Sequence, residues 1–379
     1  MAKGMYLGID NKARRVRKSY IGVDNKARRA RKAYIGVNNV ARLIFRGGEL
    51  NYHGTADNLS KARYAMAGAS VGDYALFTGG NANSVQQGTI DAYNTSLTKE
   101  SISSELSPTR WGHAGIRHNN AGEYAIFGGG CGSSAYATTD AYDTSLTLHG
   151  LDDLSQARYN LASTAVGDYV LFAGGKDNGA SPSAVTDAFS RSLTRSIPTA
   201  LSTARQYLAG ASNGDYAFFG GGRVSGACTG IVDVYNSSLS MQTLASPLSE
   251  ARYTHASAMV GKYVLFAGGQ TDDDVCDTVD VYDKSLTRTK ATSLSIARAY
   301  VNGNSLDEFA IFGGGQLASG EVSDVVDVYD SSLTRSNPTG LAQSAKEVCS
   351  ATVGEYILLA GGYVGSGTYS NKVTAYKIS

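Results

Sequence analysis

The side chains of this chain that could catalyse a reaction or hold a metal ion are few and scattered. No GxxxxGK[ST] motif is present to cradle a phosphate, and the acidic run from Asp272 to Asp274 lacks the spacing of an EF-hand loop. We expect His113 and His255 to be hydrogen-bonded polar residues at the starts of strands. The sequence therefore predicts a protein that is not an enzyme and that uses no metal and no cofactor. The five histidines are His53, His113, His118, His149 and His255.

The four cysteines do not indicate a disulfide framework. They are far apart and form no CxxC pair, so reduced and unpaired thiols are expected at Cys131, Cys228, Cys276 and Cys349. Cys228 and Cys276 follow glycine pairs in consecutive repeats. The sequence leaves open whether these two thiols meet.

The elements that must position any functional side chain belong to a repeat that returns seven times, every 45 to 50 residues. Each copy has a short apolar run that closes on paired glycines. This spacing is typical of propeller blades. The seven runs are GDYALFTGG (72–80), GEYAIFGGG (122–130), GDYVLFAGG (167–175), GDYAFFGGG (214–222), GKYVLFAGG (261–269), DEFAIFGGG (307–315) and GEYILLAGG (354–362).

Two further motifs complete each repeat, so that one repeat holds four short strands. About a dozen residues after the glycines comes an Asp-x-Tyr or a close variant that runs into a turn, beginning with DAYNTSLT at residue 91 and ending with the truncated TAYKIS at residue 374. Before the next apolar run lies a segment that ends in Ala-Arg-Tyr or a relative. Its basic residues are Arg63, Arg110, Arg158, Arg205, Arg252, Arg298 and, in the seventh copy, Lys346.

The composition of the repeat favours sheets packed against one another. A run such as Tyr169 to Phe172 is apolar on both faces, which suits a blade that lies between two neighbouring blades. Gly174 and Gly175 fit a strand end that needs positive φ or a close approach of two backbones.

Taken together, these motifs resemble the kelch repeat, in which apolar residues close on two glycines, a tyrosine follows, and an arginine leads into the next blade. The resemblance spans residues 49–379 and implies an all-β, seven-bladed kelch-type propeller. Where the family normally has a tryptophan after the tyrosine, this chain has a leucine, so the blade contacts must be rebuilt around that residue. The leucines are Leu97, Leu146, Leu193, Leu239, Leu286 and Leu333.

The ends of the chain indicate how the ring closes. The seventh repeat stops one strand after its tyrosine, and the segment that begins at Gly48 aligns with the fourth strand of the first repeat. We therefore expect residues 49–58 to supply the missing strand, which removes open sheet edges. On this register a chain without residues 1–47 still folds, and one without residues 1–60 does not.

The net charge of +1 conceals two oppositely charged parts. Residues 1–47 hold 13 Lys or Arg and only Asp10 and Asp24 as acids, which gives +11, so the remainder carries −10. The basic part repeats every 14 residues, from Tyr6, Tyr20 and Tyr34, and each unit has the pattern of a strand, a turn and a strand. Such hairpins need a partner surface. We predict an attachment or oligomerisation module over residues 1–47 and a propeller over residues 48–379.

The basic clusters allow three interpretations. Nucleic-acid binding is disfavoured because no stacking platform or groove-binding helix accompanies the charge. A membrane-surface helix is disfavoured because the spacing is that of strands, and no apolar run is long enough for a signal peptide or a bilayer span. A charged, solvated face on an attachment module remains, and we expect a homo-oligomer.

The kelch resemblance also implies where a ligand would bind. In peptide-binding members the ligand meets one face, through the residue after the glycine pair and the one or two residues after the arginine. Aromatic rings beside amides and cations suit sugar rings or extended polymers, although repeated aromatics can equally be packing residues. After the arginine the candidates are Tyr64, Trp111, Tyr159, Tyr207, Tyr253 and Tyr300; after the glycines they are Asn81, Lys176, Arg223, Gln270, Gln316 and Tyr363, with Cys131 in the second repeat.

The tandem YIGVDNKARRARKAYIGV element resembles N-terminal segments of tail proteins from phages and prophages of Gram-positive gut bacteria. That resemblance implies a virion protein, made in the host cytoplasm, whose first module binds phage tail or baseplate proteins. Two functions stay open. One is a tail fibre or receptor-binding protein whose propeller adheres to a bacterial surface glycan or protein. The other is a structural baseplate or decoration protein that contacts only other virion proteins.

Overall fold

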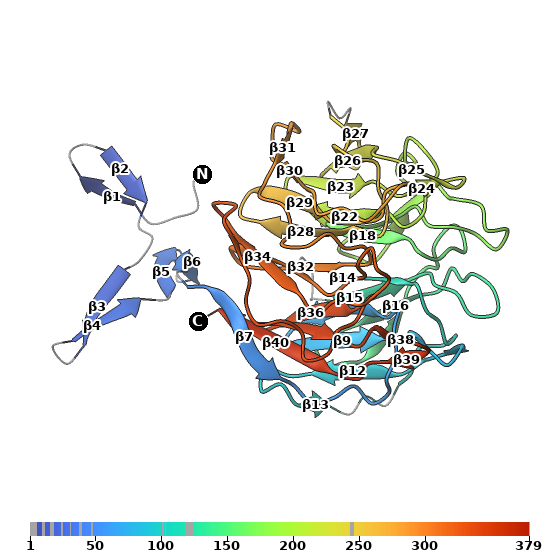
Figure 1. The fold of residues 1–379 in the computed structure, drawn as a ribbon, viewed down its shortest axis with the longest axis horizontal. Coiled ribbons are helices and arrows are strands. Elements are labelled where there is room, and N and C mark those ends of the chain that lie inside the picture. Colours follow the sequence, from blue (N-terminus) through green and yellow to red (C-terminus); the bar gives the residue numbers. More distant parts are fainter. Residues whose placement is uncertain are drawn as a thin grey trace. The chain divides into compact units, whose positions relative to one another are not determined.

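The computed structural model describes residues 48–378, except 101, 103, 119–123 and 243–245, and the backbone of six strands within residues 6–46. These residues form strands and no helix (Figure 1). Seven four-stranded antiparallel sheets follow one another along the chain. The first strands of successive sheets contact each other, and the first strand of the seventh sheet contacts that of the first. The prediction of an all-β, seven-bladed propeller is therefore confirmed.

Each blade is a meander of four strands that runs outward from the central axis. The innermost strands are β8 (Ala67–Val71), β14 (Ala114–His118), β18 (Ala162–Val166), β22 (Ala209–Ser212), β28 (Ala256–Val260), β32 (Asn302–Leu306) and β36 (Cys349–Val353). The second strands are β9 (Tyr74–Thr78), β15 (Tyr124–Gly128), β19 (Tyr169–Ala173), β23 (Tyr216–Gly220), β29 (Tyr263–Ala267), β33 (Phe309–Gly313) and β37 (Tyr356–Ala360).

The outer half of each blade contains the Asp-x-Tyr strand and a short edge strand. The third strands are β12 (Ile90–Tyr93), β16 (Thr139–Tyr142), β20 (Thr186–Phe189), β26 (Val232–Asn236), β30 (Val279–Tyr282), β34 (Val326–Asp330) and β40 (Val373–Ile378). The outermost strands are β13 (Lys99–Glu100), β17 (Leu148–Gly150), β21 (Arg195–Ser196), β27 (Met241–Gln242), β31 (Arg288–Lys290), β35 (Arg335–Ser336) and β7 (Leu50–Thr55).

The core lies between the blades. Val170, Leu171 and Phe172 of β19 have no exposed surface, as the two-faced apolar pattern of the run predicts. The interface between the first two blades combines small residues of one blade with aromatics of the next: Ala69 of β8 belongs to the same buried cluster as Phe127 of β15. The fold is therefore held together by blade-to-blade packing.

The leucines that replace the expected tryptophan occupy the turns between the third and fourth strands. All six have left-handed backbone conformations, with φ between 59° and 64°. That conformation costs a residue with a side chain about 1–2 kcal/mol. In exchange each leucine side chain packs on a cluster between two blades, as Leu146 does on the cluster that joins the first two. The expectation that leucine rebuilds these contacts is confirmed for Leu97, Leu146, Leu193, Leu239, Leu286 and Leu333.

Six blades contain a buried ion pair between the repeated arginine and the aspartate of the Asp-x-Tyr motif. In the third blade Arg158 and Asp187 are both fully buried, and Arg158 Nη2 lies 2.6 Å from Asp187 Oδ2. The same Nη2 atom of Arg158 also donates to the Phe172 carbonyl oxygen at 3.1 Å, so the guanidinium links the segment between blades to the second and third strands. The pairs are Arg63–Asp91, Arg110–Asp140, Arg158–Asp187, Arg205–Asp233, Arg252–Asp280 and Arg298–Asp327.

The seventh blade corrects one sequence prediction. We expected Lys346 to stand for the arginine, but the buried position is occupied by Ala345, and Lys346 is the next residue toward the surface. The aspartate is also replaced, by Thr374, whose hydroxyl accepts a hydrogen bond from the Ala342 amide at 3.0 Å. Both charges are therefore missing together, which avoids an unpaired charge in the interior.

The chain ends close the ring as expected. β7 forms the outer strand of the seventh blade beside β40, and the Ala56 amide donates to the Val373 carbonyl oxygen at 3.0 Å. At the inner edge of the same closure, the Ser70 hydroxyl lies 2.8 Å from that of Thr352 in β36. The first and seventh blades are thus joined at both the axis and the periphery.

The glycine pairs have the geometry that the sequence predicts. Gly174 and Gly175 have φ values of 68° and 96°. A Cβ atom added to Gly175 would lie 2.7 Å from the Tyr159 carbonyl oxygen. The backbone of the preceding interblade segment therefore needs the space that a side chain would fill.

The basic module forms three hairpins, each with antiparallel pairing, which confirms the strand–turn–strand pattern. Its other predicted properties depend on side chains outside the described residues. Among the described residues there is no helix that could cross a membrane. The hairpins are β1 (Tyr6–Ile9) with β2 (Lys12–Arg15), β3 (Ser19–Val23) with β4 (Lys26–Ala30), and β5 (Lys32–Val37) with β6 (Val40–Arg46).

Candidate ligand-binding face

The residues that follow the arginine positions and those that follow the glycine pairs lie together at one end of the propeller. In every blade the residue after the arginine position forms an isolated antiparallel bridge with the residue after the glycine pair. We call this end of the propeller the ring face. The seven bridges are Tyr64–Asn81, Trp111–Cys131, Tyr159–Lys176, Gln206–Arg223, Tyr253–Gln270, Ala299–Gln316 and Lys346–Tyr363.

The six predicted aromatics do not occupy one repeated position, which corrects the sequence interpretation. Tyr64, Trp111, Tyr159 and Tyr253 are bridge residues. In the fourth and sixth blades the bridge residues are Gln206 and Ala299, so Tyr207 and Tyr300 lie one residue further along. A motif that allows one or two residues after the arginine merges two positions that the backbone keeps separate.

The residues at this second position form a ring around the axis. All seven have left-handed φ values between 50° and 64°, because the chain reverses there before the innermost strand. In the second to seventh blades, the amide of the residue at this position donates to the carbonyl oxygen of the residue at the same position in the preceding blade. The N···O distances are 2.8–3.3 Å. Six such hydrogen bonds join seven blades. The axial ring consists of Ala65, Gly112, Asn160, Tyr207, Thr254, Tyr300 and Glu347.

Cations lie on the faces of several ring-face tyrosines. Lys176 Nζ is 4.7 Å from the centre of the Tyr159 ring, and the Arg223 guanidinium is 5.1 Å from that of Tyr253. Such contacts each contribute roughly 0.5–1 kcal/mol at exposed sites. The predicted cations and tyrosines therefore hold one another in place at the surface.

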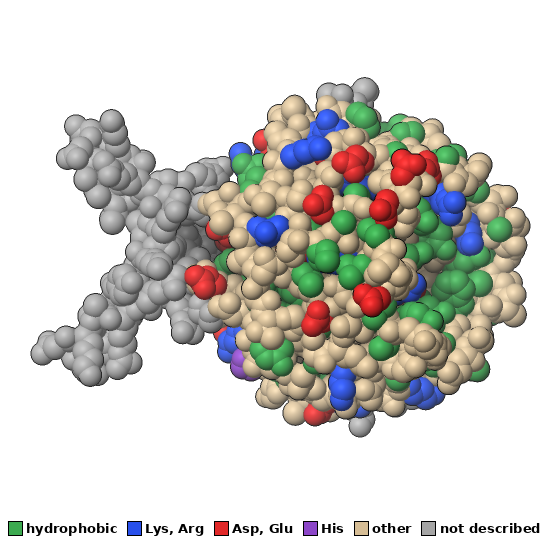
Figure 2. Space-filling view, in the orientation of Figure 1, with side chains coloured by type: hydrophobic (Ala, Val, Ile, Leu, Met, Phe, Trp, Pro, Cys, Tyr) green, Lys and Arg blue, Asp and Glu red, His purple; other side chains and the backbone are tan. Residues whose placement is uncertain are grey.

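Aromatic pairs extend this arrangement around the rim. Trp111 meets Tyr159 edge to face, with ring centres 5.5 Å apart. Tyr64 stacks on Tyr369 at 5.2 Å, and Tyr363 contacts both rings. In Figure 2, hydrophobic side chains, tyrosines included, gather toward the right of the disc, where Figure 1 shows the β24–β25 (Arg223–Val224, Ala227–Cys228) and β38–β39 (Tyr363–Gly365, Thr368–Tyr369) hairpins. The third such hairpin joins β10 (Asn81–Ala82) to β11 (Val85–Gln86).

The predicted amides differ in their surroundings. Asn81 is only 7 % exposed, so it is poorly placed to touch a ligand. Gln270 and Gln316 are partly exposed and donate to loop carbonyls, of Thr271 and Gly320. Gln316 also accepts a hydrogen bond from Lys346 at 2.9 Å. Both glutamines help to order the loops of the ring face.

The axial ring surrounds a pocket of about 310 Å³. Its wall is uneven in composition, because the small residues Ala65 and Gly112 and the large residues Tyr207 and Tyr300 occupy equivalent positions in different blades. Below the ring lie seven buried residues that immediately precede the innermost strands: Met66, His113, Leu161, Leu208, His255, Val301 and Val348. The pocket thus has a polar mouth and a largely apolar floor.

Glu347 is the acidic residue among those that line this pocket, and the sequence analysis did not identify it. Burial raises the pKa of its carboxyl, and the neighbouring Lys346 lowers it again in part. Burial also raises the pKa of Tyr207 to about 12, with Tyr300 and Glu347 as further causes. Glu347 occupies the same repeat position as Tyr207 and Tyr300. The sequence analysis did not place it there because it assigned Lys346, and not Ala345, to the arginine position.

The two histidines of the pocket floor are buried and neutral. Burial holds the pKa of His113 and of His255 well below the usual range. His113 Nε2 lies 2.8 Å from the Thr78 hydroxyl, as expected for a hydrogen-bonded residue. The ring of His255 interacts with the Gly220 backbone, which raises its pKa in part, and makes no other hydrogen bond among the described residues. Leucines and valines at the same position in other blades show that packing is the shared role.

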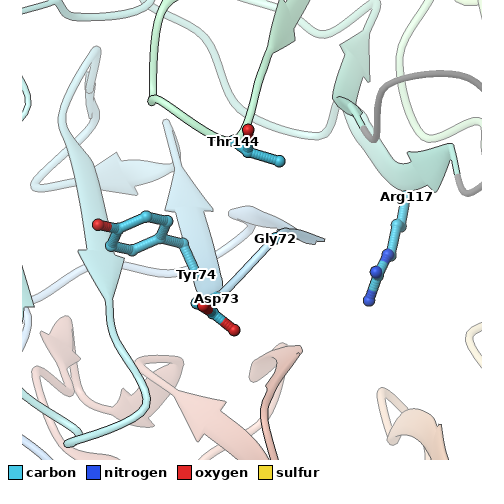
Figure 3. A pocket seen from close by; sticks show the side chains of 5 residues that line it. All are labelled: Gly72, Asp73, Tyr74, Arg117 and Thr144. Carbon is cyan, nitrogen blue, oxygen red and sulfur yellow. The ribbon is translucent and has the colours of Figure 1, made fainter. Parts of the chain in front are cut away.

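A second hollow lies at the opposite end of the blades, beside the turn between β8 and β9. It is lined by Gly72, Asp73, Tyr74, Arg117 and Thr144. Figure 3 shows the Arg117 and Asp73 side chains on either side of the open space, with Thr144 on the neighbouring turn. It holds none of the predicted site residues.

The remaining reactive groups do not form a further centre within the described residues. No three acidic, histidine or cysteine side chains there gather closely enough to hold a metal ion. All four cysteines are free. The Cys228 amide donates to the Asp272 carboxylate at 3.0 Å, and burial raises the pKa of the Cys228 thiol to about 12. Cys228 is therefore a poor nucleophile near neutral pH.

Comparison with known proteins supports the fold. The solved structure of YjhT is similar to this chain, with a TM-score of 0.57 and 13 % sequence identity over 72 % of this chain and 96 % of that one. At this identity the similarity concerns the fold alone. No protein-family model and no curated protein matches the sequence.

Proposed function

We propose that this chain is a non-enzymatic tail fibre or receptor-binding protein of a phage, and that its ring face adheres to a glycan or protein on a bacterial surface. The supporting observation is that four candidate aromatics, Tyr64, Trp111, Tyr159 and Tyr253, form bridges with the residues after the glycine pairs at one end of the propeller. Rigid aromatic rings with cations and amides beside them can contact sugar rings and hydroxyl or anionic groups with little loss of conformational freedom.

The propeller belongs, on this proposal, to a divergent kelch type. The buried arginine–aspartate pairs and the paired glycines at strand ends support that assignment. Leucine at the turn after the Asp-x-Tyr strand is the departure from the family pattern. The structure offers a physical account of the change, because the leucine side chain reaches the same blade interface from a left-handed turn.

The N-terminal hairpins, on this proposal, attach the protein to the phage tail. Their net charge of +11 against −10 for the rest of the chain gives them a distinct electrostatic preference for acidic partner surfaces. Two-stranded hairpins are marginally stable alone, so association with a tail protein or with further copies of the chain would order them. Several propellers on one particle would also strengthen weak adhesion.

Adhesion of the full chain to cells of Gram-positive gut bacteria, and to their purified wall glycans, tests the proposal. Tyr253→Ala removes a ring-face aromatic with a cation on it. Tyr263→Ala is a matched control in the same blade, because Tyr263 also carries a cation, Lys262 at 4.9 Å, but lies at the far end of β29. We expect roughly fivefold weaker adhesion for the first variant and no change for the second.

Trp111 gives an independent signal, because its partly exposed ring lies at the ring face beside Tyr159. Its fluorescence should change when a wall glycan binds. Equal losses for Tyr253→Ala and Tyr263→Ala would contradict a ring-face site. Failure to adhere to any cell, together with capture of tail proteins by the purified chain, would favour the alternative of a structural baseplate or decoration protein.

A further inference from the structure

The Glu347 carboxylate lies in the axial pocket without a partner of its own. Among the described residues no side chain forms an ion pair with it, and no hydrogen bond reaches its oxygens. The residue is partly exposed and lines the pocket. A partly desolvated carboxylate is stabilised when a cation or hydrogen-bond donor approaches it.

The nearest cation in the sequence is engaged elsewhere. Lys346 Nζ donates to Gln316 Oε1 at 2.9 Å. The same ammonium lies 4.9 Å from the Tyr300 ring centre and 5.3 Å from that of Tyr363. These three contacts engage Lys346, whose charge lowers the pKa of Glu347 without forming an ion pair with it. A ligand is therefore needed to place a cation directly against the carboxylate.

The rest of the wall suits a small organic cation. Tyr207 and Tyr300 line the pocket with Glu347, and an aromatic ring attracts a cation on its face. The Tyr300 ring already has the Lys346 ammonium 4.9 Å from its centre, which leaves Tyr207 as the aromatic wall for a ligand cation. Asn160 also lines it, and its Nδ2 is buried without a hydrogen-bond partner among the described residues. The pocket thus offers a carboxylate acceptor, an aromatic wall and one unused donor. The two buried histidines below are neutral and do not repel a cation.

We propose that the axial pocket binds a protonated primary amine that stands next to a hydroxyl or carbonyl oxygen. Glu347 would pair with the ammonium group, and Asn160 would donate to the neighbouring oxygen. Two kinds of surface molecule carry this chemistry, amino sugars and aminoacyl esters. The inference rests on the proposed adhesive function and specifies the ligand class at its centre.

Calorimetric titration of the full chain distinguishes the two sources. The amino-sugar arm compares a fully deacetylated glucosamine tetramer with its N-acetylated counterpart. The aminoacyl arm compares alanine methyl ester with N-acetylalanine methyl ester. We expect at least one free amine to bind, and its acetylated partner to bind roughly tenfold or more weakly, because acetylation removes the charge that pairs with Glu347. If neither free amine binds better than its acetylated form, the proposal is wrong.

Glu347→Gln keeps the shape of the side chain and removes its charge. We expect it to weaken binding of the free amine by roughly tenfold and to leave the acetylated form unaffected. Glu321→Gln is the control, because Glu321 is an exposed acid in a loop that follows a ring-face glutamine. Equal binding by Glu347→Gln and the unaltered chain would overturn the assignment, and the ligand comparison decides the matter independently should that variant fold poorly.

The same experiments separate this inference from the proposed function. Ring-face-dependent adhesion to cells without amine discrimination would leave the adhesive function in place and remove the ammonium site. Amine binding that depends on Glu347, without adhesion to any cell, would support the site and remove the adhesive function.

Discussion

The buried arginine–aspartate pairs predict a strong energetic coupling, and the seventh blade supplies the design of the test. In the fourth blade, Arg205 Nη1 lies 2.7 Å from Asp233 Oδ2, and Arg205 has no exposed surface. The seventh blade has Ala345 and Thr374 at the corresponding positions. We therefore consider Arg205→Ala, Asp233→Thr and the double variant that combines them.

Each single change should be severe. Arg205→Ala leaves the carboxylate of Asp233, which is 5 % exposed, with the Ser202 amide at 3.2 Å as its remaining neutral donor. It also removes the donor to the Phe219 carbonyl oxygen. Breaking a buried pair from one side typically costs about 3–5 kcal/mol in the free energy of unfolding. Asp233→Thr should cost a similar amount, because it leaves a buried guanidinium without its carboxylate.

The double variant should recover part of this loss. It removes both charges, and the new threonine hydroxyl can accept from the Ser202 amide as Thr374 does from the Ala342 amide at 3.0 Å. We expect the loss in the double variant to be smaller than the sum of the single losses by about 2 kcal/mol or more.

Urea denaturation followed by Trp111 fluorescence and by circular dichroism measures the three differences, provided that the two signals change together. A sum of single losses that matches the double loss within about 0.5 kcal/mol would refute the reasoning, because the pair would then contribute no coupling. If a single variant does not fold at all, a folded double variant still demonstrates the compensation.

Three further predictions concern closure, the glycine pairs and pH. Removing residues 1–47 should leave the melting temperature of the propeller nearly unchanged. Removing residues 1–60 should lower it markedly, because β7 and the Ala56–Val373 hydrogen bond close the seventh blade. Equal melting temperatures for the two truncated chains would contradict this register. Gly175→Ala should destabilise the fold by roughly 1 kcal/mol or more in urea denaturation, given φ of 96° and the nearby Tyr159 carbonyl, while Gly179→Ala in the following exposed loop should not. Since burial lowers the pKa of His255, the unfolded chain binds a proton more readily than the folded one, so stability should fall as pH drops below about 6.5. His255→Leu, which introduces the residue that the preceding blade has at Leu208, should weaken that dependence in melting curves from pH 7 to pH 5, and an unchanged slope would argue against a buried neutral histidine.

The site is where prediction from the sequence was least complete. The glycine pairs and arginines identified the correct ends of the strands, and these bring Tyr159 to Lys176 and Tyr253 to Gln270. The motif does not separate the bridge position from the axial position, so it does not distinguish Tyr64 from Tyr207. A loop has no periodicity that would reveal a shift of one residue in the alignment of two repeats. In the folded chain the same shift determines whether a side chain lies at the rim or at the axis.

What the sequence alone determined is the repeated architecture, because every blade must bury the same apolar strand and place the same glycines where backbones approach closely. It also specified the closure through β7, because the last repeat has three strands of its own and an unpaired outer edge is unfavourable. Only the tertiary structure decided which side chains surround the axis. Seven residues that are more than 40 positions apart converge there through hydrogen bonds between neighbouring blades, and the pocket charge of Glu347 arises from that convergence, which no local pattern encodes.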